Sequence, residues 1–388
     1  MVQTIAVFDF LSHTTMHLPF NAGYLKVLLQ AFPDDKIIFF GDAGHIENLK
    51  FDFPDEPRLS FHTAHIMNVQ DKRNHNPLSG NKAATDCFLS VIKNIDPQSL
   101  RIAAMSGADA NLLRIFRKKW GKFSSAPLHY VLHNHLAASF AWRSRNPYYR
   151  FFDFMAEFKR GLPSAQKWIA LEKGIQISVE KLVPKLKGSV ISLPHPITFG
   201  DGSSVSGSSL GDGPIKVAFL GHCSAGKGFD YFVELANEFS GPNYEFWAIG
   251  RADPSQQHLD TSKLVHQPTD GYLAADEYYQ ALSKIDMAVL PLNEGYNYVA
   301  SGSVLDAISH LKPTVMLESL TYKTIADDYG SYGPMVSDKA AIRALFLTSK
   351  KEHFAAQFPA WKKTLFEIRA HRTPEWLAQT YRKTIPND

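Results

Sequence analysis

The chain has 388 residues, a length typical of two or three domains. Hydrophobic residues make up 45% and charged residues 20%, so the chain can fill a globular core, which excludes a peptide toxin, a disordered regulator and a fibre. The 41 Lys and Arg nearly balance the 38 Asp and Glu, and this net charge of +3 argues against a dedicated nucleic-acid-binding protein. Two cysteines are too few for a disulfide framework or a cysteine zinc site, which favours a reducing compartment.

The N-terminal half alternates strand and helix patterns. Strands are predicted at 4–10, 36–40, 59–66, 101–105, 128–132, 167–171 and 190–193. Helices are predicted at 22–32, where Asn21 is a candidate N-cap, and at 85–95, 111–120 and 177–186. Such alternation predicts an α/β fold with a parallel sheet.

The Gly- and Ser-rich composition of segment 200–213 predicts a flexible linker or an exposed loop. After it the alternation restarts, with strands at 215–220, 245–249, 264–267, 287–290 and 314–316 and helices at 231–239, 276–284, 303–309, 358–369 and 374–383. We therefore expect a first domain over 1–199, the linker over 200–213, a second domain over 214–365, and a final helical segment, 366–388, that returns to the first domain.

No segment of the sequence predicts membrane insertion or secretion. Residues 1–10 lack the charged and then apolar regions of a signal peptide, and no window of about 18 residues is apolar enough to span a bilayer. We expect a cytoplasmic protein that is either soluble or located at the inner face of the cytoplasmic membrane.

The first motif, VAFLGHCSAGKGFDYF over 217–232, leads from a strand through a glycine-rich turn into a helix. Glycines let the backbone approach a ligand, the N-terminus of a helix favours an anion, and Lys227 adds a positive charge. The spacing is not that of a P-loop. A tight turn with a solvated lysine explains this segment equally well.

The second motif, over 289–316, contains Glu294 and Gly295 in a loop and then Ser301-Gly302-Ser303 at the start of a helix that carries Asp306. Backbone N–H groups at that start can bind a diphosphate, and Asp306 can accept hydrogen bonds from ribose hydroxyls. Taken alone, an ordinary serine N-cap with a carboxylate in the first turns is the simpler explanation.

The order of these motifs, with Gly250-Arg251 between them and Lys312-Pro313 after them, resembles the C-terminal half of GT-B glycosyltransferases of the family 4 type (glycosyl transferases group 1). The resemblance covers about residues 215–345. It implies two Rossmann-like domains facing across a cleft. It also implies a nucleoside-diphosphate sugar as substrate, no cofactor, and no metal, because a lysine and a helix N-terminus supply the positive charge.

By this resemblance, Lys227 neutralises the donor diphosphate, Asp306 holds the ribose, and Glu294 contacts the sugar at the reaction centre. The other expected donor-binding residues are Gly221, His222, Gly250, Arg251, Tyr298, Ser301 and Gly302. Two features depart from the family pattern. His222 stands where an arginine is expected, and Glu294 and Asp306 are twelve positions apart rather than eight, which puts Tyr298 at the glutamate's spacing.

In the first half, His133 ends a strand, where it resembles a family histidine that contacts the donor sugar, and His17 lies in the loop after the first strand. An inverting enzyme needs a base, which His17 or Asp9 can supply, whereas a retaining enzyme can use the leaving phosphate. A structural strand-end role for His133 stays open, and a metal at His133 and His135 is disfavoured because no further ligand is near in sequence. The expected acceptor-side residues are Asn21, Gly23, His135, Arg143 and Arg145.

The stretch 140–160 combines many aromatic side chains with Arg and Lys. It fits a peripheral membrane contact near a lipid-linked acceptor, and it fits equally a core helix with solvated cations. A nucleic-acid partner is disfavoured by the overall charge.

The resemblance implies a glycosyltransferase that moves a sugar, with a UDP-sugar favoured as donor, to a hydroxyl of a glycan or lipid-linked glycan in bacterial surface polysaccharide synthesis. The alternatives are a nucleotide-sugar 2-epimerase of the same fold and a catalytically weak partner that binds a glycan or another subunit.

Overall fold

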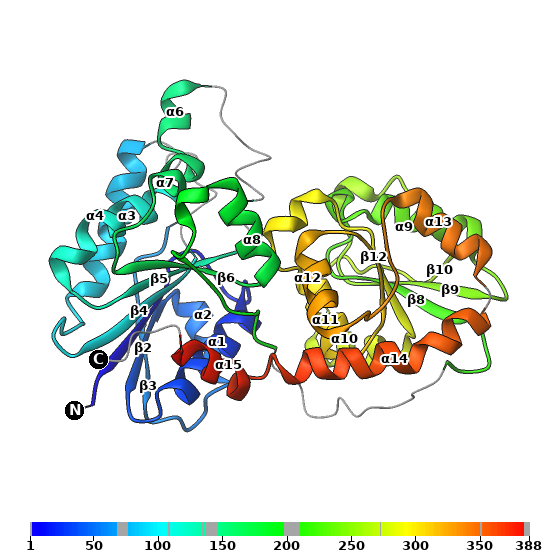
Figure 1. Cartoon of the computed structure of the whole chain (residues 1–388), viewed down its shortest axis with the longest axis horizontal. Coiled ribbons are helices and arrows are strands. Elements are labelled where there is room, and N and C mark those ends of the chain that lie inside the picture. The colour runs from blue at the N-terminus through cyan, green and yellow to red at the C-terminus, as the bar shows by residue number, and fades with distance from the viewer. Residues whose placement is uncertain are drawn as a thin grey trace. The chain divides into compact units, whose positions relative to one another are not determined.

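The computed structural model describes residues 2–67, 77–107, 109–133, 136, 146–197, 210–271, 273–349 and 351–383. The chain forms two compact units (Figure 1). The first comprises Met1–Thr198 with Arg372–Asp388, and the second comprises Phe199–His371. Within the described ranges, no helix has both the length and the apolar character needed to cross a bilayer.

The first unit is built on a seven-stranded sheet in the order β3-β2-β1-β4-β5-β6-β7, and every pair is parallel. Its strands are apolar runs because helices cover both faces of the sheet. The strands are β1 (Thr4–Asp9), β2 (Lys36–Gly41), β3 (Leu59–Thr63), β4 (Leu100–Gly107), β5 (Leu128–Leu132), β6 (Gln166–Ala170) and β7 (Val190–Ser192).

Figure 1 shows α1, α2 and α15 on one face of this sheet and α3, α4 and α7 on the other. The helices of the unit are α1 (Leu18–Ala31), α2 (Ala43–Lys50), α3 (Pro77–Ile92), α4 (Ala110–Phe123), α6 (Pro147–Phe151), α7 (Phe154–Arg160), α8 (Lys173–Leu182), the 3₁₀ turn η2 (Pro184–Leu186) and α15 (Pro374–Arg382).

The first helix begins earlier than its sequence pattern indicates. We expected Asn21 as its N-cap, but α1 starts at Leu18, with His17 at the cap position in a left-handed conformation (φ 55°). Pro19 suits the first turn, since its missing N–H would be unsatisfied there anyway. Asn21 and Gly23 therefore lie inside the helix, where both are buried, and not in the loop.

The C-terminal helix α15 packs in the first unit. The Tyr381 hydroxyl lies 2.9 Å from the Tyr24 hydroxyl of α1 and 2.9 Å from His129 Nδ1 of β5. Nearby, the Arg372 guanidinium and the Glu172 carboxylate form a buried ion pair, with Nη2 and Oε2 2.9 Å apart. The Ile197 N–H donates to the Arg372 carbonyl at 3.0 Å, so the segments where the chain leaves and re-enters this unit lie side by side.

The second unit has a six-stranded parallel sheet in the order β10-β9-β8-β11-β12-β13. Figure 1 shows α9 and α13 on one face and α10 and α11 on the other. The strands are β8 (Ile215–Leu220), β9 (Tyr244–Ile249), β10 (Leu264–His266), β11 (Met287–Leu290), β12 (Thr314–Leu317) and β13 (Met335–Val336).

The helices of this unit are α9 (Phe229–Phe239), α10 (Ala275–Lys284), α11 (Gly302–Ser309), α12 (Leu320–Tyr329), α13 (Lys339–Thr348) and α14 (Lys351–Ala370), with 3₁₀ turns η3 (Ala225–Lys227), η4 (Pro254–Gln256) and η5 (Glu294–Tyr298). Phenylalanines of β8, β9 and α9 pack with Trp361 of α14 in one core. All the strands expected from the sequence are present in the expected order, and the structure adds β13 and the helices α2, α6, α7, α12 and α13. Helices α3 and α14 begin at Pro77 and Lys351, seven or eight residues earlier than expected.

The described part of the stretch 140–160 has features of both a core helix and an exposed aromatic surface. On α7, Phe154 and Phe158 are buried against Trp168 of the sheet. On α6, by contrast, Tyr148 and Phe151 are 48% and 61% exposed. Arg143 and Arg145 lie outside the described residues.

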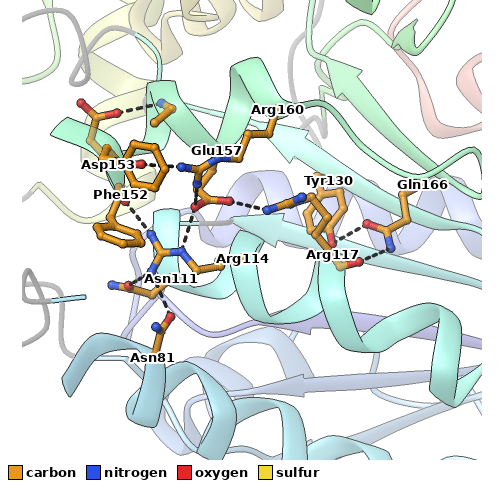
Figure 2. A network of polar contacts seen from close by, with 12 residues as sticks. Asn81, Asn111, Arg114, Arg117, Tyr130, Phe152, Asp153, Glu157, Arg160 and Gln166 are labelled. Atoms are coloured by element: carbon orange, nitrogen blue, oxygen red, sulfur yellow. Dashed lines mark hydrogen bonds and ion pairs between the residues drawn. The ribbon is translucent and has the colours of Figure 1, made fainter. Parts of the chain in front are cut away.

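A buried carboxylate fixes the corner between α6 and α7, as Figure 2 shows. Glu157 is fully buried and contacts the guanidinium groups of Arg114, Arg117 and Arg160, the first two at 2.8 Å. Arg114 also donates to the Phe152 carbonyl at 2.6 Å, and Arg160 donates to the Phe151 carbonyl at 2.8 Å. Through these two hydrogen bonds the network fixes the backbone at the C-terminal end of α6.

Replacing Glu157 with glutamine should destabilise the first unit, because the three guanidinium groups would lose their shared carboxylate. Removing one partner of a buried ion pair costs about 3 kcal/mol or more. Urea denaturation followed by tryptophan fluorescence would measure this loss. As a control, E47Q removes an exposed carboxylate paired with Lys50 and should cost under about 0.5 kcal/mol. Equal effects of the two variants would contradict the structural role of Glu157.

Candidate functional site

In the second unit, the turn after β8 lies against the turn after β9. Gly221 has a φ of +85° and Gly250 a φ of +151°, and a Cβ on Gly250 would lie 1.9 Å from the Gly221 carbonyl oxygen. The Gly221 N–H donates to the Ile249 carbonyl at 2.8 Å, and the Cys223 N–H donates to the Arg251 carbonyl at 2.9 Å. The two turns are therefore held together by backbone hydrogen bonds, and only glycine fits at Gly250.

Lys227 points back toward the end of β8. Its Nζ donates to Ser303 Oγ at 2.9 Å, and that hydroxyl donates to the Leu220 carbonyl at 2.7 Å. A Cβ on Gly221 would meet both Ser303 Oγ and Lys227 Nζ, so the glycine leaves room for the ammonium group. Burial lowers the pKa of Lys227, and the charge of Asp306 opposes this effect. The bond through Ser303 fixes the lysine to α11.

Asp306 lies on α11 beside this lysine. Its Oδ2 accepts a hydrogen bond from the Tyr278 hydroxyl of α10 at 2.9 Å. Burial raises the pKa of the Asp306 carboxyl to about 6, against the opposing effects of the Tyr278 hydrogen bond and the Lys227 charge. Asp306 is therefore mainly ionised at neutral pH, and its charge partly balances that of Lys227.

The N-terminus of α11 has no side-chain cap. Ser301 occupies the N-cap position, and its buried Oγ has no hydrogen-bond partner among the described residues. The first N–H groups of a helix have no intrahelical partner, so they remain able to bind an anion. Gly302 at the first helical position is exposed and adds no side chain there.

The loop that carries the expected sugar contacts is the 3₁₀ turn η5. Asn293 caps it through the Gly295 N–H at 3.0 Å and also donates to the Gly226 carbonyl at 2.9 Å, which ties η5 to η3. Glu294 begins the turn and is exposed, and Tyr298 ends it and is half-buried.

His222 lies next to acidic and basic groups of the following turn. Its Nε2 lies 3.3 Å from Asp253 Oδ2. Burial and the charge of Arg251 lower the pKa of His222, and the charge of Asp253 raises it. At neutral pH the imidazole is mainly uncharged and does not replace the guanidinium of the family pattern.

In the first unit, a polar network organises the loop after β1. Buried Asp9 accepts hydrogen bonds from the Ser12 N–H at 2.9 Å and from Asn21 Nδ2 at 2.6 Å. Asn21 Nδ2 also lies 2.9 Å from His45 Nε2, and His45 Nδ1 lies 2.8 Å from the Thr14 carbonyl. This pattern assigns the proton of His45 to Nδ1 and the lone pair to Nε2.

The side chains of Asn21 and Asp9 are therefore buried and hydrogen-bonded to other groups of the first unit. Burial alone would raise the pKa of Asp9, but hydrogen bonds from Asn21, Ser12 and Leu11 hold it below its ordinary value. Of the two candidate bases, the geometry favours His17, because the Asp9 carboxylate is buried. Asn21 and Gly23 are buried in α1 and not in the loop where they were expected, and their acceptor-side role stays a prediction.

His17 and His133 lie together at the carboxyl end of the sheet. Their rings stack with centroids 4.7 Å apart, and Phe20 contacts His133 edge-on at 4.4 Å. The His195 ring also contacts Phe20, with centroids 5.0 Å apart. Burial lowers the pKa of His17, which the charge of Asp9 opposes, so its imidazole is mainly neutral at pH 7. Thr14 and His17 both have positive φ, which indicates backbone strain in this loop.

The structure therefore gathers Gly221, Lys227, Gly250 and Asp306 in one unit and His17 and His133 in the other. His135 lies outside the described residues. In the part of the chain that is described, no group of three or more His, Cys, Asp or Glu is placed to hold a metal ion. The sequence analysis missed Ser303 as a partner of Lys227, and it missed Tyr278, His45 and His195 altogether, because their contacts join segments far apart in the chain.

Comparison with solved structures identifies the fold of the chain. No protein-family model matches the chain, and no curated protein matches it in sequence. The structure is similar to WaaG, a glycosyltransferase involved in lipopolysaccharide biosynthesis, with a TM-score of 0.60 and 11% identity over 99% of this chain and 100% of that one. The chain has the GT-B fold.

Two further solved structures are similar over nearly their whole length. The lipopolysaccharide outer core galactosyltransferase WaaB has a TM-score of 0.60 and 10% identity, covering 98% of this chain and 99% of that one. HepE from Anabaena, solved in complex with UDP and glucose, has a TM-score of 0.56 and 12% identity, covering 99% and 95%.

Replacing Asp9 with asparagine should loosen the loop after β1, because an amide cannot accept from all the N–H donors that surround this carboxylate. Leaving buried donors unsatisfied costs about 1–3 kcal/mol. Hydrogen exchange of the Leu11 and Ser12 amides should become faster, and D34N, at an exposed carboxylate, should leave it unchanged. Unchanged exchange in D9N would contradict the role assigned to Asp9.

Proposed function

We propose that this GT-B protein is a glycosyltransferase that moves a sugar from a nucleoside-diphosphate sugar to a hydroxyl of a glycan or lipid-linked glycan. A UDP-sugar is favoured as donor, and bacterial surface polysaccharide synthesis as the setting. The observation that carries the proposal is the cluster of Lys227, Ser303 and Asp306 beside the uncapped N-terminus of α11. One positive group and a set of free N–H groups here face the place where a nucleotide binds in such folds.

On the donor side, the leaving diphosphate would be stabilised by the Lys227 ammonium and the first N–H groups of α11. Ser303 orients the lysine, so little reorganisation is needed when negative charge develops on the leaving group. No metal ion is required in this scheme, because the charge comes from the protein itself. Asp306, ionised at neutral pH, would accept hydrogen bonds from the ribose hydroxyls.

On the acceptor side, His17 and His133 are the candidates for contact with the reacting groups. A neutral His17 can accept the proton of an acceptor hydroxyl, as an inverting reaction requires. In a retaining reaction the leaving phosphate would take that proton instead. The anomeric configuration of the product, read by NMR, distinguishes the two routes.

The similar structures support this choice of substrates. WaaG and WaaB are named for lipopolysaccharide synthesis, and HepE was solved with UDP and glucose. The decisive experiment is a thermal-shift screen with UDP, GDP, ADP and their sugars, since a ligand that binds the native state raises the melting temperature. Incubation of the best sugar nucleotide without acceptor then separates the transferase from a 2-epimerase, which would convert the donor.

Replacing Lys227 with alanine should abolish most transfer activity while the fold remains, because the diphosphate would lose its ammonium partner. We expect kcat/KM to fall by about 100-fold or more, a typical effect for removing one group that stabilises developing charge. K284A, at an exposed lysine on α10, is the control and should keep full activity. Near wild-type turnover in K227A would contradict the diphosphate assignment.

We further propose that the surface of α6 contacts the cytoplasmic membrane where a lipid-linked acceptor resides. Tyr148, Arg150 and Phe151 are exposed on this short helix, and Arg160 stacks on the Phe151 ring at 4.4 Å. The Glu157 network fixes the corner below them. Exposed aromatic rings beside cations fit an interface with anionic lipid headgroups.

A double substitution, F151S with R150E, should reduce binding to phosphatidylglycerol-containing vesicles by about tenfold in a sedimentation assay, since it removes an apolar anchor and reverses a charge. F366S is the matched control: Phe366 is an exposed ring of α14 beside Arg369, outside the proposed surface. An equal effect of both changes, or no binding by the wild type, would overturn the membrane contact.

A further inference from the structure

Tyr278 is a residue that neither the motifs nor the resemblance assign. It lies on α10, which precedes β11, whereas Asp306 lies on α11, which follows that strand. Its hydroxyl spans the two helices and donates to Asp306 Oδ2 at 2.9 Å. The contact joins positions 28 residues apart, so the sequence pattern of either helix does not reveal it.

The two oxygens of the Asp306 carboxylate have different roles in this arrangement. Oδ2 is occupied by Tyr278, which leaves Oδ1 as the acceptor for a ligand hydroxyl. Burial and the neighbouring carboxylate raise the pKa of Tyr278 well above its ordinary value, so its hydroxyl keeps the proton and remains a donor. A hydrogen bond to the ionised form of a buried carboxyl favours that form.

Other groups face this carboxyl from the neighbouring elements. Lys227 of η3 acts through its charge. His310, one turn further along α11, contacts the Asp306 backbone carbonyl at 3.0 Å, and the ring of Tyr279 stacks on His310 at 4.9 Å. Cys223, after β8, lies near enough to influence both Tyr278 and Lys227. The Tyr278 hydroxyl is the group that donates directly to the carboxylate side chain.

We propose that Tyr278 is a positioning residue that keeps Asp306 ionised and aimed at the ribose of the donor nucleotide. This inference rests on the proposed function. The tyrosine does not itself contact the nucleotide. It sets the pH above which the carboxylate recognises the ribose hydroxyls, and so extends nucleotide binding into mildly acidic conditions.

The test compares UDP binding by wild type and Y278F in calorimetric titrations from pH 5.5 to 8. Loss of the hydrogen bond should raise the midpoint of Asp306 titration by about one pH unit. The ratio of the two dissociation constants should then be below about twofold at pH 8 and rise to about fivefold at pH 6. The titration of the terminal phosphate of UDP is common to both proteins and cancels in this ratio.

Two variants complete the design. Y279F removes a hydroxyl from the adjacent position of α10 and should leave the UDP dissociation constant unchanged at every pH. D306N removes the titrating group, and adding Y278F to it should then have no pH-dependent effect. A Y278F-to-wild-type ratio that does not change with pH, whether near one or uniformly raised, overturns the inference. Failure of the wild type to bind UDP, GDP or ADP overturns the proposed function instead.

Discussion

The contact between the turns after β8 and β9 is the constraint on which the arrangement of Lys227, Ser303 and α11 depends. Because Gly250 approaches the Gly221 carbonyl so closely, no side chain fits between them, and the hydrogen-bond ladder of the two strands continues into their turns. This fixes Gly221 with positive φ and opens a space beside it. The Lys227 ammonium and the Ser303 hydroxyl occupy that space, and Ser303 reaches the Leu220 carbonyl. The lysine, the strand end and the N-terminus of α11 are thereby held in one arrangement.

In the first unit a buried carboxylate, and not a pair of glycines, fixes the loop that follows a strand. Asp9 at the end of β1 accepts backbone N–H groups of the following loop and the amide of Asn21, and His45 extends the network to the Thr14 carbonyl. Such a network specifies one conformation for a loop that includes left-handed non-glycine residues. The two units therefore differ at these strand ends. The second has a helix N-terminus without a side-chain cap, and the first has the stacked imidazole rings of His17 and His133.

The sequence predicted the order of strands well, because strands buried on both faces are short apolar runs that periodicity detects. It missed α2, an eight-residue helix of mixed composition whose signal is the cap at Asp42, directly after a strand. It misplaced Asn21 and Gly23 because the start of α1 depends on Pro19 and on the left-handed His17. Lys227 and Asp306 were predicted as site residues from motif spacing, and that role stays a prediction. Their contacts with Ser303 and Tyr278 join positions 76 and 28 residues apart, which no local sequence pattern reveals.

The charges around Lys227 bear on the presence of a histidine at position 222, where the family pattern has an arginine. A nucleotide-sugar diphosphate carries two negative charges, and the buried pair of Lys227 and Asp306 contributes almost no net charge of its own. In the proposed function, attraction beyond that of the Lys227 ammonium would come from the first N–H groups of α11 and from Arg251 near the end of β9. His222 lies between Arg251, which disfavours its protonation, and Asp253, which favours it. If the diphosphate binds beside His222, as the resemblance implies, its negative charge would raise the pKa of His222 and so favour the protonated imidazole, which the charge of Arg251 disfavours in the free protein.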